Sequence, residues 1–338
     1  MRGIDVEKVS AWLVANIDGA QAPFEFSLIA GGHSNLTYRV VGADGSPYVL
    51  RRPPLGHVLA TAHDMAREHR IISAVGMTDV PVPRTLGLCT DDQVNGAPFY
   101  VMSYVEGTVL DSVERGESVP AATRTKLSEH LIDVLADLHA VDVDAVGLGT
   151  LAKREGYVER QIKRWTTQWA NSKTRELPEV DEVARRLAND VPEQQGVSIA
   201  HGDYRFGNCL TDVDAGRIEA VLDWELCTLG DPLADVGYLA VYWTDPGAPA
   251  GRGNDPTAAG GYGSHADLVR RYAVRTGRDV SRIPYYVAFS RFRLAVIGEG
   301  VYARYLHGVM GDATDEQIAN FKQGPELLIV TALHELGG

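Results

Sequence analysis

Cysteines, basic residues and long apolar runs are all scarce in this sequence of 338 residues. Its 32 Lys and Arg residues face 45 Asp and Glu residues, which gives a formal net charge of −13. This balance disfavours nucleic-acid binding, because such binding depends on a basic surface that neutralises phosphates. No apolar run is long enough to span a bilayer, and the opening segment MRGIDVEKVSAWLVANIDG predicts a capped amphipathic helix, not a signal peptide. We therefore expect a cytoplasmic protein with neither nucleic acid nor membrane as a partner.

The three cysteines, Cys89, Cys209 and Cys227, have neither the even number of a disulfide framework nor the paired spacing of a zinc site. We expect them to be reduced residues that pack in the interior. The acidic charge would suit a cationic substrate, and it would equally serve only to keep the protein soluble. The composition, 45% hydrophobic and 23% charged, is that of a globular protein. The length favours a protein of two lobes.

The first third of the chain predicts a small α+β lobe. β-rich segments separated by glycine-containing turns indicate antiparallel strands, and a helix is inserted at 61–75. The five predicted strands are FEFSLIA (24–30), LTYRVV (36–41), PYVLRR (47–52), TLGLCT (85–90) and APFYVMSYVEG (97–107).

From about Pro120 the apolar residues recur with the helical period of about 3.6 residues. A first helix ends near His139, and the stretch 244–263, rich in Gly, Pro and Asp, predicts a mobile surface loop. We predict an amino-terminal lobe at 1–105 and a mainly helical lobe at 106–338. Further helices are expected at 154–171, 178–190, 232–243, 264–276, 284–307 and 315–335.

The segment HGDYRFGNCLTDVDAGRIEAVLDWE (201–225) carries the most informative polar residues. Asp203 and Asn208 lie in a loop after the strand VSIA, and Asp223 ends the strand IEAVL. Two strands of a hairpin can aim an amide oxygen and a carboxylate at one point, and such hard ligands suit Mg²⁺ bound together with phosphate oxygens. A second carboxylate nearby can orient a hydroxyl and accept its proton. Taken singly, Asp and Asn residues of this kind more often form turns and caps.

Three motifs in the expected order resemble the aminoglycoside phosphotransferase and choline kinase superfamily, which has a protein-kinase-like fold. HGDYRFGN resembles its H-G-D-x-x-x-x-N catalytic loop, VLDWE its metal-binding segment, and LGDPLADVGYLA its G-D-P-x-x-D-L-A stretch. The residues of these motifs most resemble those of the kinase-like domain related to acyl-CoA dehydrogenase fusions. The resemblance implies an α+β, two-lobed kinase-like fold, with a small five-stranded antiparallel sheet lobe and a larger helical lobe. It also implies that Asp203 is the catalytic base, that Asn208 and Asp223 bind Mg²⁺, and that Asp235 braces the catalytic loop.

In the first lobe, the same resemblance implies a nucleotide site. Arg51 stands where the family carries a phosphate-binding lysine, and strand alternation places Val49 beside it as a roof for adenine. Glu68 is the expected helix partner of Arg51. Either Arg51 or Arg52 could contact phosphate, and both could instead be surface residues on an edge strand. Two further segments complete the predicted site. The turn with Gly32, His33, Ser34 and Asn35 could approach the phosphates, or it could be an ordinary hairpin turn. The hinge backbone at Ser103, Tyr104 and Val105 would meet the adenine edge.

These patterns predict a phosphotransferase that uses ATP and Mg²⁺ and acts on a hydroxyl group of a small molecule, as a monomer or homodimer. The alternatives are a kinase of a hydroxyacyl or other anionic metabolite, and a nucleotide-binding pseudokinase without turnover. A metal-dependent hydrolase with His201, Asp203 and Asp223 as ligands is a further alternative. Most polar residues of the long helix near 284–307 are expected in the core or in salt bridges. If two of its arginines point into the cleft, an anionic substrate is favoured over an aminoglycoside.

Overall fold

A five-stranded antiparallel sheet forms the amino-terminal lobe of the computed structural model, which describes residues 1–30, 35–55, 64–248, 255–308 and 314–337. The strand order is β1-β2-β3-β5-β4. The strands are β1 (Glu25–Ala30), β2 (Leu36–Val41), β3 (Pro47–Arg52), β4 (Thr85–Cys89) and β5 (Phe99–Ser103). The five predicted strands are confirmed. Because β3 is the central strand, the prediction of an edge strand for Arg51 and Arg52 is wrong.

The period of two along the strands gives the sheet two different faces. Tyr38, Leu50 and Val101 pack in one apolar cluster with helix α1 (Val6–Asn16). Val49, Tyr100 and Met102 belong to the other cluster, with α2 (Met65–Val75). Strand β3 therefore turns Val49 and Arg51 towards α2 and the second lobe.

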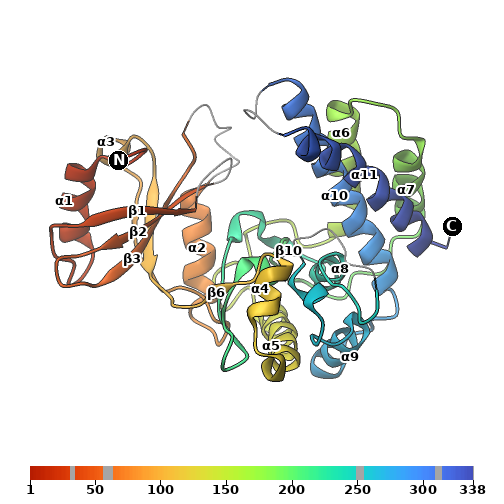
Figure 1. Ribbon diagram of the computed structural model, residues 1–338, viewed down its shortest axis with the longest axis horizontal. Coiled ribbons are helices and arrows are strands. Elements are labelled where there is room, and N and C mark those ends of the chain that lie inside the picture. Colours follow the sequence, from red (N-terminus) through yellow and green to blue (C-terminus); the bar gives the residue numbers. More distant parts are fainter. Residues whose placement is uncertain (31–34, 56–63, 249–254, 309–313, 338) are drawn as a thin grey trace.

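The rest of the chain is mainly helical, and Figure 1 shows it as a second lobe beside the sheet, with α2 next to the junction. The predicted helices are confirmed to within a few residues. The remaining helices are α3 (Asp92–Asn95), α4 (Val113–Ser118), α5 (Ala121–Ala140), α6 (Tyr157–Ser172), α7 (Pro178–Asn189), α8 (Leu233–Val241), α9 (His265–Thr276), α10 (Ile283–Leu306) and α11 (Asp315–Glu335).

The second lobe also contains short strands and 3-10 helices, and their pairing differs from the hairpin predicted for VSIA and IEAVL. The strand at Ser198–Ala200 does not pair with the strand before Asp223. The sequence analysis missed an intervening strand, because short strands are defined by their partners more than by composition. The elements are β6 (Thr108–Val109), β7 (Ser198–Ala200), β8 (Cys209–Asp212), β9 (Arg217–Val221) and β10 (Thr228–Gly230), with 3-10 helices η1 (Phe206–Asn208), η2 (Trp224–Leu226) and η3 (Pro256–Ala259). β8 pairs with β9 and β6, whereas β7 pairs with β10.

The predicted surface loop at 244–263 is only partly a loop. Its second half contains η3, and Tyr262 is fully buried there, with its hydroxyl donating to the Gly116 carbonyl at 2.9 Å. Asp255 is also buried and caps η3 through the Thr257 amide. Gly and Pro content predicted the turns, but it could not predict that this half packs against α4.

The packing of α8 on α10 fixes the framework behind the loop at 201–208. A Cβ atom at Gly237 of α8 would lie 2.6 Å from the Tyr286 backbone of α10, so this approach requires glycine. Within the described ranges, none of the helices is both long and apolar enough to cross a membrane. The division of the chain at 105/106 stays a prediction.

Candidate active site

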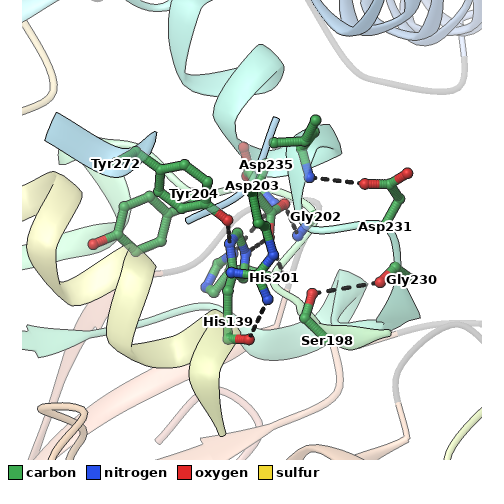
Figure 2. Close-up of polar contacts among 12 residues, drawn as sticks. His139, Ser198, His201, Gly202, Asp203, Tyr204, Gly230, Asp231, Asp235 and Tyr272 are labelled. Carbon is green, nitrogen blue, oxygen red and sulfur yellow. Dashed lines mark hydrogen bonds and ion pairs between the residues drawn. The ribbon is translucent and has the colours of Figure 1, made fainter. Parts of the chain in front are cut away.

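The loop that carries Asp203 is held from beneath by Asp235 of α8. The backbone amides of His201 and Gly202 donate to the two oxygens of the Asp235 carboxylate at 2.7 and 2.8 Å (Figure 2). Gly202 adopts a φ of 82°, and a Cβ atom there would meet the Leu226 carbonyl at 2.9 Å. The chain therefore turns at the one residue type that allows this conformation.

Asp235 is in turn fixed by His139 from α5. The His139 Nε2 atom lies 3.2 Å from the Asp235 carboxylate, and its Nδ1 atom lies 2.8 Å from the Tyr272 hydroxyl. Burial alone would raise the pKa of Asp235, but the hydrogen bonds from His139 and from the Gly202 amide bring it below the usual value. Burial lowers the pKa of His139. Asp235 thus remains ionised and holds the loop through its amides.

His201 is a structural residue of the same loop. Its Nδ1 atom accepts from the Asp203 amide at 3.2 Å, and so its Nε2 atom donates to the Leu222 carbonyl at 2.9 Å. Since both ring nitrogens are occupied and the side chain is fully buried, the prediction of His201 as a metal ligand in a hydrolase is wrong.

Asp203 stands at the edge of this framework with part of its carboxylate accessible. Its side chain is 20% exposed, and one oxygen lies 3.4 Å from the Arg205 Nε atom. The Tyr238 hydroxyl lies 3.4 Å from the Tyr242 hydroxyl, and burial together with the nearby charge of Asp203 raises the pKa of Tyr238. Sequence reasoning missed Tyr238 and Arg205, although both lie within the motifs that it quoted.

Asn208 and Asp223 are brought together by the open end of the β8–β9 hairpin. Cys209 pairs with Val221, and the Leu222 amide donates to the Asn208 carbonyl at 2.8 Å. The Asn208 side-chain amide donates to the Asp203 carbonyl at 2.8 Å, which leaves its side-chain oxygen as an acceptor. Asp223 has a φ of 64°, the left-handed region, and it is the only residue other than glycine with a positive φ in the described ranges. Strained backbone of this kind concentrates at functional sites.

Arg51 links the two lobes at this point. Its NH2 atom lies 2.6 Å from the Asp223 carboxylate, and its Nε atom lies 3.0 Å from Glu68 of α2. Burial would lower the pKa of Arg51, but the charges of Glu68, Tyr100 and Asp223 raise it above the ordinary value. Burial also raises the pKa of Glu68. The expected pair of Arg51 and Glu68 is therefore present, and it extends to Asp223.

Arg52 and the residues of the predicted phosphate turn lie differently. Arg52 is buried on the opposite face, where its Nε atom donates to the Pro53 carbonyl at 3.1 Å. Asn35 is buried, with its amide 3.4 Å from Glu68. The other three residues predicted for this turn, Gly32, His33 and Ser34, lie outside the described residues.

A cavity of about 320 Å³ separates the lobes beside Arg51. Val49 lines it from the sheet, and Leu210 and Val221 line it from the second lobe. The three predicted hinge residues line it as well, namely Ser103, Tyr104 and Val105. A largely apolar slot that ends at Arg51 and Asp223 matches a flat aromatic base that carries an anionic tail.

The oxygen atoms of Asn208 and Asp223 fit Mg²⁺ better than a transition metal. Among the described residues, no group of three or more His, Cys, Asp or Glu side chains could hold a metal by itself. Mg²⁺ is typically bound by one or two protein oxygen ligands together with substrate phosphates and water. The donor set therefore fits a cation that arrives with a phosphate ligand.

A sheet lobe and a helical lobe with this constellation between them define a phosphotransferase of the kinase type. Residues 25–269 match the model of the phosphotransferase enzyme family, and the chain belongs to that family.

Known proteins support this assignment. The chain is 36% identical over 303 residues to the mouse (Mus musculus) acyl-CoA dehydrogenase family member 10, covering 87% of this chain and 28% of that protein. It thus spans less than a third of the length of this relative. A crystal structure of a candidate aminoglycoside phosphotransferase from Ralstonia eutropha is 33% identical, with a TM-score of 0.83 over 98% of both chains. The ADP-bound aminoglycoside phosphotransferase APH(2'')-Ib, 14% identical with a TM-score of 0.57 over 98% of this chain and 99% of that chain, shares the fold alone.

Proposed function

We propose that the protein transfers the γ-phosphate of ATP to a hydroxyl group of a small molecule in a Mg²⁺-dependent reaction. One observation carries this proposal. Arg51 of the sheet lobe and Asp223 of the helical lobe are 2.6 Å apart, at the end of a cavity lined by the hinge. Asn208, which contacts the Asp203 backbone, stands at the base of the same hairpin.

Each group has a role that its position supports. Val49 and the backbone at 103–105 would hold adenine, and Arg51 would bind the phosphates while Glu68 orients it. Asn208 and Asp223 would hold Mg²⁺, which supplies charge neutralisation at the transferring phosphoryl group. Asp203 would orient the acceptor hydroxyl and take its proton. The ADP-bound relative with the same fold supports the choice of nucleotide.

The pseudokinase alternative is less well supported, because the residues predicted as base and metal ligands are all present in the sequence, and the side chains of Asp203 and Asp223 are partly exposed. We also propose a cytoplasmic protein that acts on a small molecule as a monomer or homodimer, without a nucleic-acid or membrane partner. These last statements rest on composition and charge.

Nucleotide binding measured by thermal shift tests the proposal. We expect ATP to raise the Tm only in the presence of Mg²⁺, and we expect Asp223→Asn to abolish that dependence. Asp214→Asn, an exposed residue of the same hairpin, is the matched control and should behave as wild type. Stabilisation by ATP that is identical with and without Mg²⁺ in wild type would contradict the metal role.

A further inference from the structure

A second cavity, of about 360 Å³, lies on the α2 and α6 side of the catalytic loop. Arg67 of α2, Arg164 of α6 and Arg293 of α10 all line it, and so does Gly202. Arginines from three helices thus line one cavity beside the loop that carries Asp203. Figure 1 shows α6 and α10 side by side in the helical lobe.

Arg293 is placed there with donor capacity that the protein does not use. Its side chain is 8% exposed, and its guanidinium lies over the rings of Trp165 (5.6 Å) and Tyr238 (5.0 Å). The Nε atom of Arg293 is buried without a hydrogen-bond partner, and the same is true of the Trp165 Nε1 atom. Buried donors in native proteins are nearly always paired, so two orphan donors in one cavity indicate an acceptor that binds there.

The other two arginines add positive charge to the cavity wall. No ion pair joins Arg67, Arg164 or Arg293 to a carboxylate in the described ranges, although Arg67 donates to the Cys227 carbonyl at 2.5 Å. Arg164 lies over the Trp165 ring at 5.1 Å. Grouped guanidinium groups are well suited to bind a carboxylate or phosphate, because each presents a planar fork of donors.

Three carboxylates line the same cavity. Asp64 caps α2 by accepting from the Arg67 amide at 2.9 Å, and Glu68 pairs with Arg51. Glu225 is the third carboxylate that lines the cavity. Because Arg51 balances the charge of Glu68, three arginines face the charges of Asp64 and Glu225, and the remaining positive charge favours an anionic occupant.

The cavity also adjoins the reacting groups. Gly202, which directly precedes Asp203, lines the cavity, and burial together with the charge of Asp203 raises the pKa of Tyr238, whose ring Arg293 covers. A molecule anchored on Arg293 would thus bring a hydroxyl close to Asp203. Arg293 is the one arginine of α10 that lines this cavity. Arg291 lies 3.8 Å from Glu335, and Arg304 is exposed.

We propose that Arg67, Arg164 and Arg293 form a subsite for an anionic group of the phosphate acceptor, and that the acceptor is a hydroxylated carboxylate or phosphate ester. This inference rests on the proposed phosphotransfer and adds the charge of its second substrate. It departs from the aminoglycosides named for several proteins of the same fold, because an aminoglycoside is a polycation and would meet three like charges here.

Calorimetric titration with a charge-matched series tests the proposal. The ligands are glycerate (carboxylate), glycerol 1-phosphate (phosphate), glycerol (neutral) and choline (cation), each added to protein that holds Mg²⁺ and a non-hydrolysable ATP analogue. We expect at least one of the two anions to bind and glycerol and choline to bind more weakly. The stronger of the two anions identifies the group that the subsite prefers.

Substitutions then assign the effect to the cavity. Arg293→Gln should weaken binding of the preferred anion roughly 30-fold or more, because it removes one partner of a buried charge pair. Arg164→Gln, at an exposed position of α6, should weaken it less and serves if the first variant does not fold. Arg304→Gln on the same helix is the matched control and should bind as wild type.

Three outcomes overturn the proposal: no binding of either anion, binding of glycerol or choline as tight as that of the anions, or equal losses in Arg293→Gln and Arg304→Gln. Weaker binding of the ATP analogue to Arg293→Gln would assign the arginines to the nucleotide phosphates instead. If wild type fails to bind the analogue, the proposed phosphotransfer itself fails, and that result is seen before any acceptor is added.

Discussion

Two pairs of aspartates in the helical lobe have the same chemistry and different surroundings. Asp231 and Asp235 are buried and saturated with donors, since Asp231 accepts from the Tyr286 hydroxyl at 2.7 Å and from the Leu233 amide at 3.0 Å. The side chains of Asp203 and Asp223 are 20% and 30% exposed, and Asp223 lines the cavity between the lobes. The first pair fixes backbone, whereas the second pair retains lone pairs for a ligand.

The number of acceptor positions left open predicts that Asp203 and Asp223 take part in the reaction and that Asp231 and Asp235 support the fold. An ionised carboxylate has about four acceptor positions. Asp235 gives its positions to two backbone amides and His139. If this distinction is correct, substitution of the exposed pair should reduce activity without loss of stability. Substitution of the buried pair should mainly reduce stability.

Replacement of the base should have the largest effect. We expect Asp203→Asn to lower kcat by a factor of about 10² to 10⁴, because the amide cannot accept the hydroxyl proton. Its free energy of unfolding should stay within about 0.5 kcal/mol of wild type. ADP release and urea unfolding measure the two effects. A variant with wild-type turnover would remove Asp203 from the reaction.

The opposite pattern is expected for Asp235→Asn. An amide group cannot accept from both loop amides while it also faces His139, so we expect the free energy of unfolding to fall by about 2 to 4 kcal/mol. Urea unfolding of this variant beside Asp203→Asn gives the direct contrast. Unchanged stability would show that Asp235 does not brace the loop.

An intermediate effect is expected for Arg51→Lys at the lobe junction. Lysine keeps the charge, but its single ammonium group cannot contact Glu68 and Asp223 through separate nitrogens as the guanidinium does. We expect the KM for ATP to rise by roughly threefold to tenfold, a loss of about 1 kcal/mol. Arg52→Lys, on the other face of the sheet, is the control for ATP binding. Equal effects of the two variants on KM would dissociate Arg51 from the nucleotide.

The smallest effect is a pH dependence of stability that comes from His139. Burial lowers its folded pKa below 6.5, so the unfolded chain binds a proton more readily than the folded chain. The stabilising contribution is full above about pH 6.5 and is lost as the pH falls towards the folded pKa. His139→Gln cannot titrate, and so the difference in Tm between wild type and this variant should shrink on acidification below about pH 6.5. A constant difference across that range would contradict this origin.

Much of the fold could be predicted from the sequence because local patterns specify it. The five strands and the long helices follow from periods of two and about 3.6 residues, and the three motifs placed Asp203, Asn208 and Asp223 at one site. Strand alternation also separated Val49 and Arg51 from Arg52 once β3 was known to be central. The roles of these residues in catalysis and binding stay predictions.

The rest depends on contacts between distant segments. Strands β6, β8 and β10 contain two to four residues and are defined by their partners. The burial of Tyr262 results from packing against α4, which its polar neighbours do not reveal. The arginine cavity combines α2, α6 and α10, and of its three arginines only Arg293 lies on the long helix whose arginines were considered for the cleft. The spacing of these arginines along the chain does not indicate that they line one cavity.

The left-handed backbone at position 223 limits which side chains the site can tolerate. Glutamate would keep the negative charge, yet it disfavours this conformation more than aspartate or asparagine does. Glycine would adopt the conformation readily but would remove the oxygen ligand. Asparagine would fit the backbone and provide only one neutral oxygen. Aspartate is thus the one common amino acid that supplies both the turn and a full anionic ligand, so Asp223→Glu is expected to destabilise the fold more than Asp223→Asn, although glutamate keeps the charge.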